Sequence, residues 1–159
     1  MLNIMGKYMN ANFVCIQLDM EHGEGPELNK TFNVKAYPTF IFFDAEGKEM
    51  SRFEGMCMQY EFQKRCERIL KGEAPIVKED SETAKKVQPQ VAEKDTIIDE
   101  GKGVNFIKGS DVRLADVLAQ AKRENKRVLV DFWATWCHAC MKMNNTTFRD
   151  TRIGNLMNY

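Results

Sequence analysis

The chain has 159 residues, of which 43% are apolar, and it carries 23 basic and 23 acidic side chains. This length suits one compact domain with an additional segment, and the apolar share is sufficient for a core. A net charge near zero gives no reason to expect nucleic acid or an anionic membrane as a partner. No apolar run approaches the ~20 residues that span a bilayer, so we expect no membrane span.

The N-terminal segment and the cysteines indicate the cellular compartment to expect. The segment from Met1 to Asn12 lacks the charged start and long apolar run of a signal peptide, so the chain as written is expected in the cytoplasm. Its five cysteines are an odd number, which argues against a disulfide-stapled secreted scaffold. Only Cys137 and Cys140 have a diagnostic spacing, C-x-x-C.

Helix and strand signals alternate along the first 72 residues. Helices are predicted over residues 2–12, 27–32 and 59–71, and strands over 13–18, 39–43 and 49–53. A turn over Asp44 to Lys48, with Gly47 as its permissive residue, joins the last two strands, and the third strand is expected near an edge because it is more polar. Gly72 is placed to cap the last helix.

The composition changes between Glu73 and Gly103, where charged residues dominate and no aromatic residue occurs. Such a segment buries too little apolar surface to become ordered, so we predict a flexible linker. Order returns with a strand over Val104 to Ile107 and a helix over Val112 to Glu124, which Asp111 would cap. Arg127 to Trp133 is almost entirely apolar, as is typical of a central strand covered on both faces.

The chemistry is concentrated directly after this strand, where residues 130–140 read VDFWATWCHAC. A helix is predicted to begin at Cys137, and the unpaired N–H groups and positive end of a helix stabilise a thiolate. Cys137 is therefore the expected exposed nucleophile, and Cys140, one turn further, would resolve the mixed disulfide. A protonated His138 between them would stabilise the Cys137 thiolate and make the disulfide more oxidising.

This segment resembles the active site of the thioredoxin superfamily, which has the form strand, W-C-x-x-C, helix. Its continuation over Met141 to Asp150 is most similar to the soluble C-terminal domain of bacterial transmembrane thiol:disulfide interchange reductases. A second motif, Ala36 to Phe43 (AYPTFIFF), resembles the cis-proline strand of the same family. The resemblance implies an α/β fold of three layers, in which helices cover both faces of a central mixed sheet of about five strands.

The resemblance also implies roles for individual residues and for partners. Asp131 would be the buried carboxylate that moves a proton to or from Cys140, and the Cys137–Cys140 disulfide would be the redox group, with no metal or other cofactor. Partners would be proteins that carry thiols or disulfides, together with an upstream reductase or oxidase. If the chain is cut from a longer parent, the implied compartment is the bacterial periplasm or cell envelope. The residues expected to line the substrate groove are Tyr37, Pro38, Trp136 and His138.

The two halves stand in the reverse of the family's order. Residues 1–72 resemble the cis-proline half, residues 104–159 resemble the C-x-x-C half, and residues 73–103 form the linker. Three arrangements remain open: a circular permutant that closes on itself, a piece cut from two tandem domains, and a homodimer that swaps halves. A linker of ~30 residues can extend on the order of 100 Å, so closure within one chain is geometrically easy.

The predicted function is thiol–disulfide exchange with protein partners, and two interpretations compete with it. In one, the groove binds a peptide or a metal without turnover, although zinc usually takes four ligands and the chain has only His22 and His138 as histidines. In the other, the chain is a split fragment whose halves pair poorly. The remaining cysteines, Cys15, Cys57 and Cys66, are expected to be buried apolar residues.

Overall fold

The computed structural model of the protein describes residues 4–73 and 103–149, and five strands in these ranges form one mixed sheet. The strands are β1 (Phe13–Asp19), β2 (Thr39–Phe43), β3 (Glu49–Glu54), β4 (Phe106–Ile107) and β5 (Arg127–Trp133). The helices are α1 (Ile4–Asn12), α2 (Gly25–Thr31), α3 (Gln59–Leu70), α4 (Leu114–Glu124) and α5 (His138–Asn145). The spatial order of the strands is β3-β2-β5-β1-β4, in which β1, β4 and β5 are parallel and β2 is antiparallel to β5 and β3.

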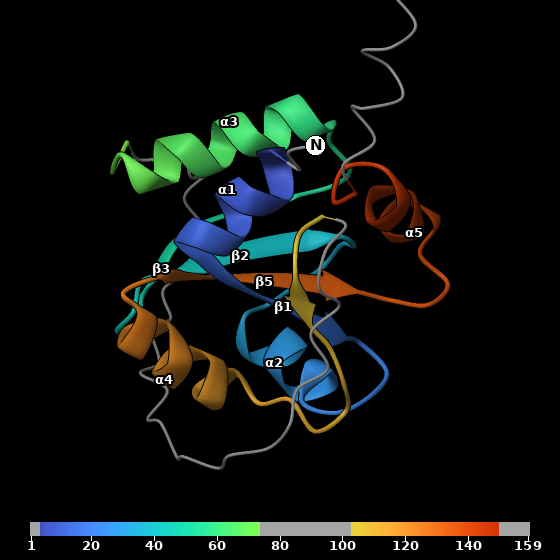
Figure 1. The fold of residues 1–159 in the computed structure, drawn as a ribbon. Helices are drawn as coiled ribbons and strands as arrows, with labels where there is room; N and C mark the ends of the chain where they lie inside the picture. Colours follow the sequence, from blue (N-terminus) through green and yellow to red (C-terminus); the bar gives the residue numbers. More distant parts are fainter. Residues whose placement is uncertain (1–3, 74–102, 150–159) are drawn as a thin grey trace, which may run out of the picture.

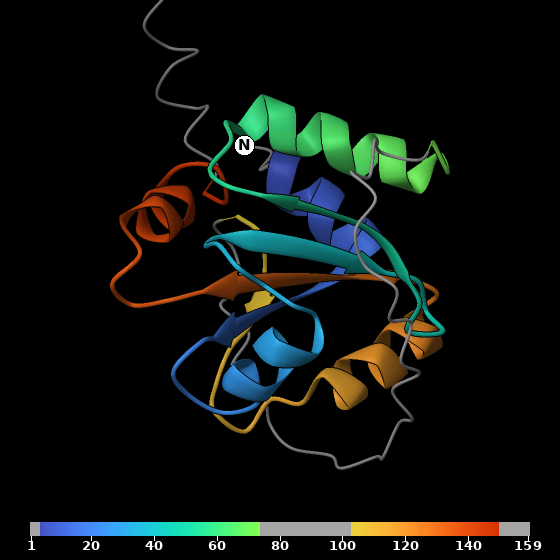
Figure 2. The ribbon, with the colours of Figure 1, turned by 180° about the vertical axis from the view of Figure 1, so that it is seen from behind.

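Helices cover both faces of the sheet and produce three layers (Figures 1 and 2). On one side lie α1, α3 and α5, and on the other lie α2 and α4. Apolar side chains fill the space between the sheet and the helices on both sides. On the side of α1, α3 and α5, the rings of Phe40, Phe62 and Phe148 pack edge to face. On the side of α2 and α4, the apolar cluster includes Val130, Phe132 and Leu118. The three-layer α/β architecture predicted from the sequence is therefore confirmed.

The central strand is β5, because its side chains are apolar toward both faces. Val128, Leu129, Val130 and Phe132 are completely buried. β5 pairs with β1 from Phe13↔Arg127 to Asp19↔Trp133 and with β2 on its other edge, so it holds together two strands that do not pair with each other. The sheet is thus built from both parts of one chain.

The predicted boundaries of the halves and an exchange of halves between two chains stay predictions. Most of the predicted linker, residues 74–102, and the last ten residues of the second half lie outside the described residues. In the described part, no helix is both long enough and apolar enough to cross a membrane. The cytoplasmic and the envelope locations both remain predictions.

The predicted hairpin turn between β2 and β3 is confirmed. Asp44 Oδ1 accepts hydrogen bonds from the backbone N–H groups of Glu46 (3.0 Å) and Lys48 (2.9 Å). Gly47 adopts φ +83°, a conformation that glycine takes without steric cost. β3 lies at the edge of the sheet, as its more polar sequence predicted.

The predicted cap of α4 is wrong. The helix begins at Leu114 rather than Val112, and its N-cap residue is Arg113, not Asp111. The cap is instead Glu24, the residue directly before α2. Its Oε2 atom accepts a hydrogen bond from the Leu114 N–H at 2.9 Å, and its Oε1 atom lies 3.2 Å from Arg113 Nε. A carboxylate at this position satisfies a free N–H group and interacts favourably with the helix dipole.

The strand predicted over residues 104–107 is shorter than expected, because only Phe106 and Ile107 pair with β1. The Val104 N–H instead donates to the Phe148 carbonyl at 2.9 Å. Asn10 at the end of α1 connects this segment to the N-terminal part: it donates to the Gly103 carbonyl (3.2 Å) and accepts from the Asn105 N–H (2.8 Å).

Candidate active site

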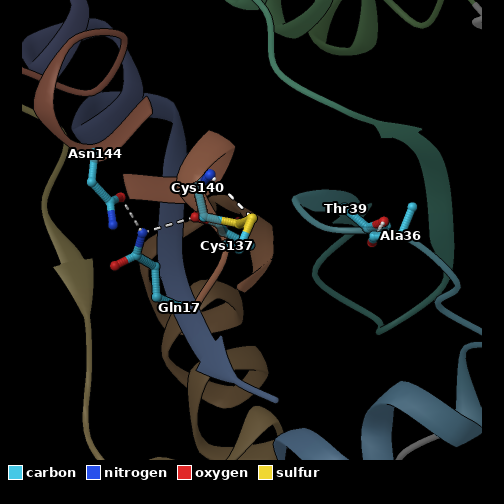
Figure 3. Close-up of a disulfide and its surroundings, with 7 residues drawn as sticks. Gln17, Ala36, Thr39, Cys137, Cys140 and Asn144 are labelled. Atoms are coloured by element: carbon cyan, nitrogen blue, oxygen red, sulfur yellow. Dashed lines mark hydrogen bonds between the residues drawn. A yellow bond between two sulfur atoms is a disulfide. The ribbon is translucent and has the colours of Figure 1, made fainter. Parts of the chain in front are cut away.

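Cys137 and Cys140 form a disulfide at the beginning of α5, with 5.3 Å between their Cα atoms (Figure 3). Cys137 is the N-cap residue of α5, and its Sγ accepts a hydrogen bond from the Cys140 N–H at 3.2 Å. The helix start predicted at this cysteine is therefore confirmed. In the reduced protein the same N–H and the positive helix end favour a thiolate at Cys137.

The predicted exposure of Cys137 is wrong for this disulfide form. The exposed fraction is 6% for Cys137 and 3% for Cys140. Both sulfurs lie in a small apolar cluster with Ala134, against which Tyr37 and Trp133 pack. Trp136 is 61% exposed and His138 is exposed, so these two residues form the solvent-facing rim of the disulfide.

The segment before β2 lies against this rim. Its Tyr37–Pro38 peptide bond is cis, as the resemblance implied. The Tyr37 ring contacts the Trp136 ring edge to face, with 5.7 Å between centroids, which brings the two predicted groove residues together. Pro38 is buried, and its carbonyl accepts from the Gly55 N–H at 2.8 Å. Figure 3 places two further residues of this segment across from the disulfide, Ala36 and Thr39.

Asp131 is buried in β5, opposite Gln17 of β1. Gln17 Nε2 donates to Asp131 Oδ2 at 2.8 Å and to Asn144 Oδ1 of α5 at 2.7 Å. Burial raises the pKa of Asp131 to about 7, although the Gln17 hydrogen bond and the charge of Lys108 act in the opposite direction. An acid with a pKa near neutrality can both accept and donate a proton at physiological pH.

Gln17 and Asn144 are site residues that the sequence analysis missed. Asn144 and Cys140 are four residues apart on α5 and therefore occupy one face of the helix. In Figure 3 the Gln17 amide nitrogen points toward Asn144, to which a dashed line joins it. One signal was available: Gln17 is the polar residue within the apolar run FVCIQL, and a buried polar side chain needs hydrogen-bond partners.

The other three cysteines are free and buried, which confirms that they pack as apolar residues. Burial raises the pKa of Cys57 to about 11 and raises those of Cys15 and Cys66 as well, so all three are poor nucleophiles. Among residues 4–73 and 103–149, no group of three or more His, Cys, Asp or Glu side chains is arranged to hold a metal ion.

Comparison with known proteins supports this site. A family model described as thioredoxin-like matches residues 111–158, which contain α4, β5 and α5. Residues 111–158 are therefore similar to thioredoxin-like domains. The thioredoxin-like match includes Asp131 and both cysteines, whereas the cis-proline segment lies outside it and reaches the disulfide through the fold.

Two curated relatives are similar to a 51-residue stretch of this chain. They are the thiol:disulfide interchange proteins DsbD of Vibrio vulnificus strains CMCP6 and YJ016, each 43% identical over 31% of this chain. The aligned stretch is 9% and 8% of the length of these relatives, so the chain spans less than a tenth of either one. No solved structure matches the chain.

Proposed function

We propose that the protein exchanges thiols and disulfides with protein partners through the Cys137–Cys140 couple. The observation that carries the proposal is the disulfide at the N-terminus of α5, with the cis-proline segment packed beside it and a buried acid linked to α5 through Gln17. The name of these relatives, thiol:disulfide interchange protein, supports the same chemistry.

The first step begins from the reduced protein. The Cys137 thiolate, stabilised by the Cys140 N–H, attacks one sulfur of a partner disulfide. A bond forms between Cys137 and that sulfur, the partner's S–S bond breaks, and the other partner sulfur leaves as a thiolate. The rim formed by Trp136 and His138, together with Tyr37 beside it, contacts the partner during this step.

The second step releases the partner. Asp131 accepts the proton of the Cys140 thiol, and the Cys140 sulfur attacks Cys137 Sγ. The Cys137–Cys140 bond forms while the bond to the partner breaks, so the second partner sulfur leaves as a thiolate. Two electrons have then passed from the protein to the partner. An upstream dithiol reductase returns them, and with an upstream oxidase the same steps run in reverse.

A redox titration tests the proposal. The protein is equilibrated in glutathione or dithiothreitol buffers, and the fluorescence of Trp136 and Trp133 is followed in the wild type and in Cys140→Ala. We expect one two-electron transition that Cys140→Ala abolishes. Cys57→Ala, which removes a buried cysteine outside the couple, is the matched control and should keep the transition.

The same Cys140→Ala variant should trap a mixed disulfide between Cys137 and a partner protein, because the resolving thiol is absent. A wild type without any transition, or a transition that survives in Cys140→Ala, contradicts the proposal. A wild type that binds a peptide or stoichiometric zinc but shows no transition would instead identify a binding module.

A further inference from the structure

A pocket of about 340 Å³ lies at the carboxyl ends of β1 and β5. Gln17, Trp133 and Lys108 are among the residues that line it. The pair formed by His22 and Asp19, 2.9 Å apart, also lines the pocket, and the His22 side chain is 67% exposed. The pocket thus has several polar side chains in its lining, and it connects the buried Gln17 with the protein surface.

The hydrogen bonds of Gln17 fix the orientation of its amide. Both partners, Asp131 Oδ2 and Asn144 Oδ1, accept from the amide nitrogen, so the nitrogen faces them and the two N–H groups are used. The amide oxygen is thereby turned away from Asp131. Gln17 Oε1 and Asp131 Oδ1 are buried and have no hydrogen-bond partner among the described residues. A pocket of this size that is open to the surface and lined in part by polar side chains has room for water molecules that bond to such atoms.

We propose that Gln17 and Asn144 are positioning residues that hold Asp131 so that the proton of Cys140 passes through Asp131 to water in this pocket. The inference rests on the proposed function. The Gln17 amide donates a hydrogen bond to Oδ2 of Asp131. The other oxygen, Oδ1, is therefore the one that carries the proton. Asn144 keeps the Gln17 amide in this orientation. If the amide were flipped, its oxygen would face two other acceptor oxygens, those of Asn144 and Asp131, and both hydrogen bonds would be lost.

The proton balance follows the second step of the exchange. The Cys140 thiol gives its proton to Asp131 Oδ1, and its sulfur uses the freed electron pair to form the bond to Cys137 Sγ. The partner sulfur leaves with the electron pair of the broken S–S bond. Asp131 then releases the proton to pocket water and returns to the carboxylate, which the positive charge of Lys108 favours.

Few other groups that titrate or carry charge act on Asp131. Lys108 follows β4, and Cys15 of β1 interacts electrostatically with the carboxyl group. β2 places the apolar Phe40 opposite Asp131, and α5 contributes the neutral Asn144 through Gln17. A change in the pH profile after substitution of Gln17 or Asn144 is therefore assignable to Asp131.

The test compares Gln17→Leu and Asn144→Ala with the control Asn145→Ala, which alters an exposed neighbour on α5. The rate at which the Cys137 mixed disulfide is resolved is measured from pH 5 to pH 9. Gln17→Leu removes a hydrogen bond that favours the ionised carboxyl group of Asp131. The midpoint of the pH profile of the resolution rate should therefore rise by about one pH unit, and the rate at pH 6 should fall about tenfold. Asn144→Ala should shift the midpoint in the same direction by less.

An infrared titration of the carboxyl band that Asp131→Asn removes gives a second readout, independent of turnover. Its midpoint should shift with the rate profile in both variants and stay unchanged in Asn145→Ala. Asn144 is partly exposed, so Asn144→Ala should disturb folding less than a change at the buried Gln17. It still allows the test if Gln17→Leu does not fold. Unshifted midpoints in a variant that keeps the Cys137–Cys140 transition overturn the positioning role and leave the proposed function standing. A wild type without that transition overturns the proposed function itself.

Discussion

Tyr37 and Trp136 come from opposite parts of the chain, yet their rings meet edge to face at 5.7 Å. The contact joins the cis-proline segment before β2 to the residue that precedes Cys137. It makes one continuous aromatic surface beside the disulfide, of which Trp136 is the more exposed part. A protein partner whose sulfur approaches Cys137 must contact this surface.

Trp136→Ala should therefore slow exchange with a protein disulfide about tenfold, since a large interfacial aromatic side chain commonly contributes a factor of this order. Exchange with a small-molecule disulfide should change much less, because it needs little of this surface. Stopped-flow kinetics with both substrates measures the difference. Tyr60→Ala, which removes a similarly exposed aromatic side chain on α3, is the control. An equal loss with both substrates would argue against a partner-binding role.

His138→Gln should make the couple more reducing. A protonated imidazole next to Cys137 stabilises its thiolate, and its removal disfavours the reduced state of the pair. We expect the midpoint potential to become more negative by about 10–30 mV. Redox titrations of the variant and the wild type in the same buffer measure this. A midpoint that does not move would show that His138 leaves the couple unaffected.

Asp131 should make the stability of the oxidised protein depend on pH. Its pKa is raised from 3.8 to about 7 in the folded protein, so folding takes up a proton between these values and stability falls as pH rises. Below about pH 4 both states are protonated, and above about pH 7 the loss levels off at on the order of 4 kcal/mol.

Asp131→Asn removes this titration. Relative to the wild type, the variant should gain stability between pH 4 and pH 7, as measured by urea unfolding of the oxidised protein at several pH values. Asp111→Asn, at an exposed residue before α4, is the control and should change the stability little at any pH. A pH-independent difference between Asp131→Asn and the wild type would mean that the folded-state pKa is not raised.

The five cysteines should fall into two reactivity classes. Cys15, Cys57 and Cys66 are buried, with raised thiol pKa values, so the folded oxidised protein should react only slowly with a thiol reagent. Reduction should add rapid labelling at Cys137, and unfolding should expose all free thiols. Mass spectrometry of the labelled peptides assigns each site. Rapid labelling of Cys66 in the folded protein would contradict the packing described above.

Glu24→Gln should destabilise the protein by about 1 kcal/mol, because it weakens the cap and the dipole interaction at the start of α4. Glu27→Gln, an exposed acidic residue in the first turn of α2, is the matched control. Thermal unfolding of both variants measures the effect. Equal unfolding temperatures for Glu24→Gln and Glu27→Gln would show that Glu24 does not stabilise the start of α4.

The sequence predicts what depends on neighbouring residues and fails where a partner is distant. The buried runs of β2 and β5, the Asp44 turn and the helix start at Cys137 are all local patterns, and they are confirmed. The cap of α4 was misassigned because Glu24 lies far away in the chain and reaches Leu114 only after folding. The Gln17–Asp131 pair likewise depends on the register of two parallel strands, which neither strand's sequence encodes alone.

The position of β5 between β1 and β2 has a consequence for biosynthesis. Translation delivers Phe13–Asp19 and Thr39–Phe43 long before Arg127–Trp133, and the two early strands have no pairing with each other. The edges that these two strands present to β5 therefore lack their partner until β5 is synthesised, and exposed strand edges promote aggregation. Slow translation of the codons before residue 127 prolongs this exposure, so it should lower the soluble yield.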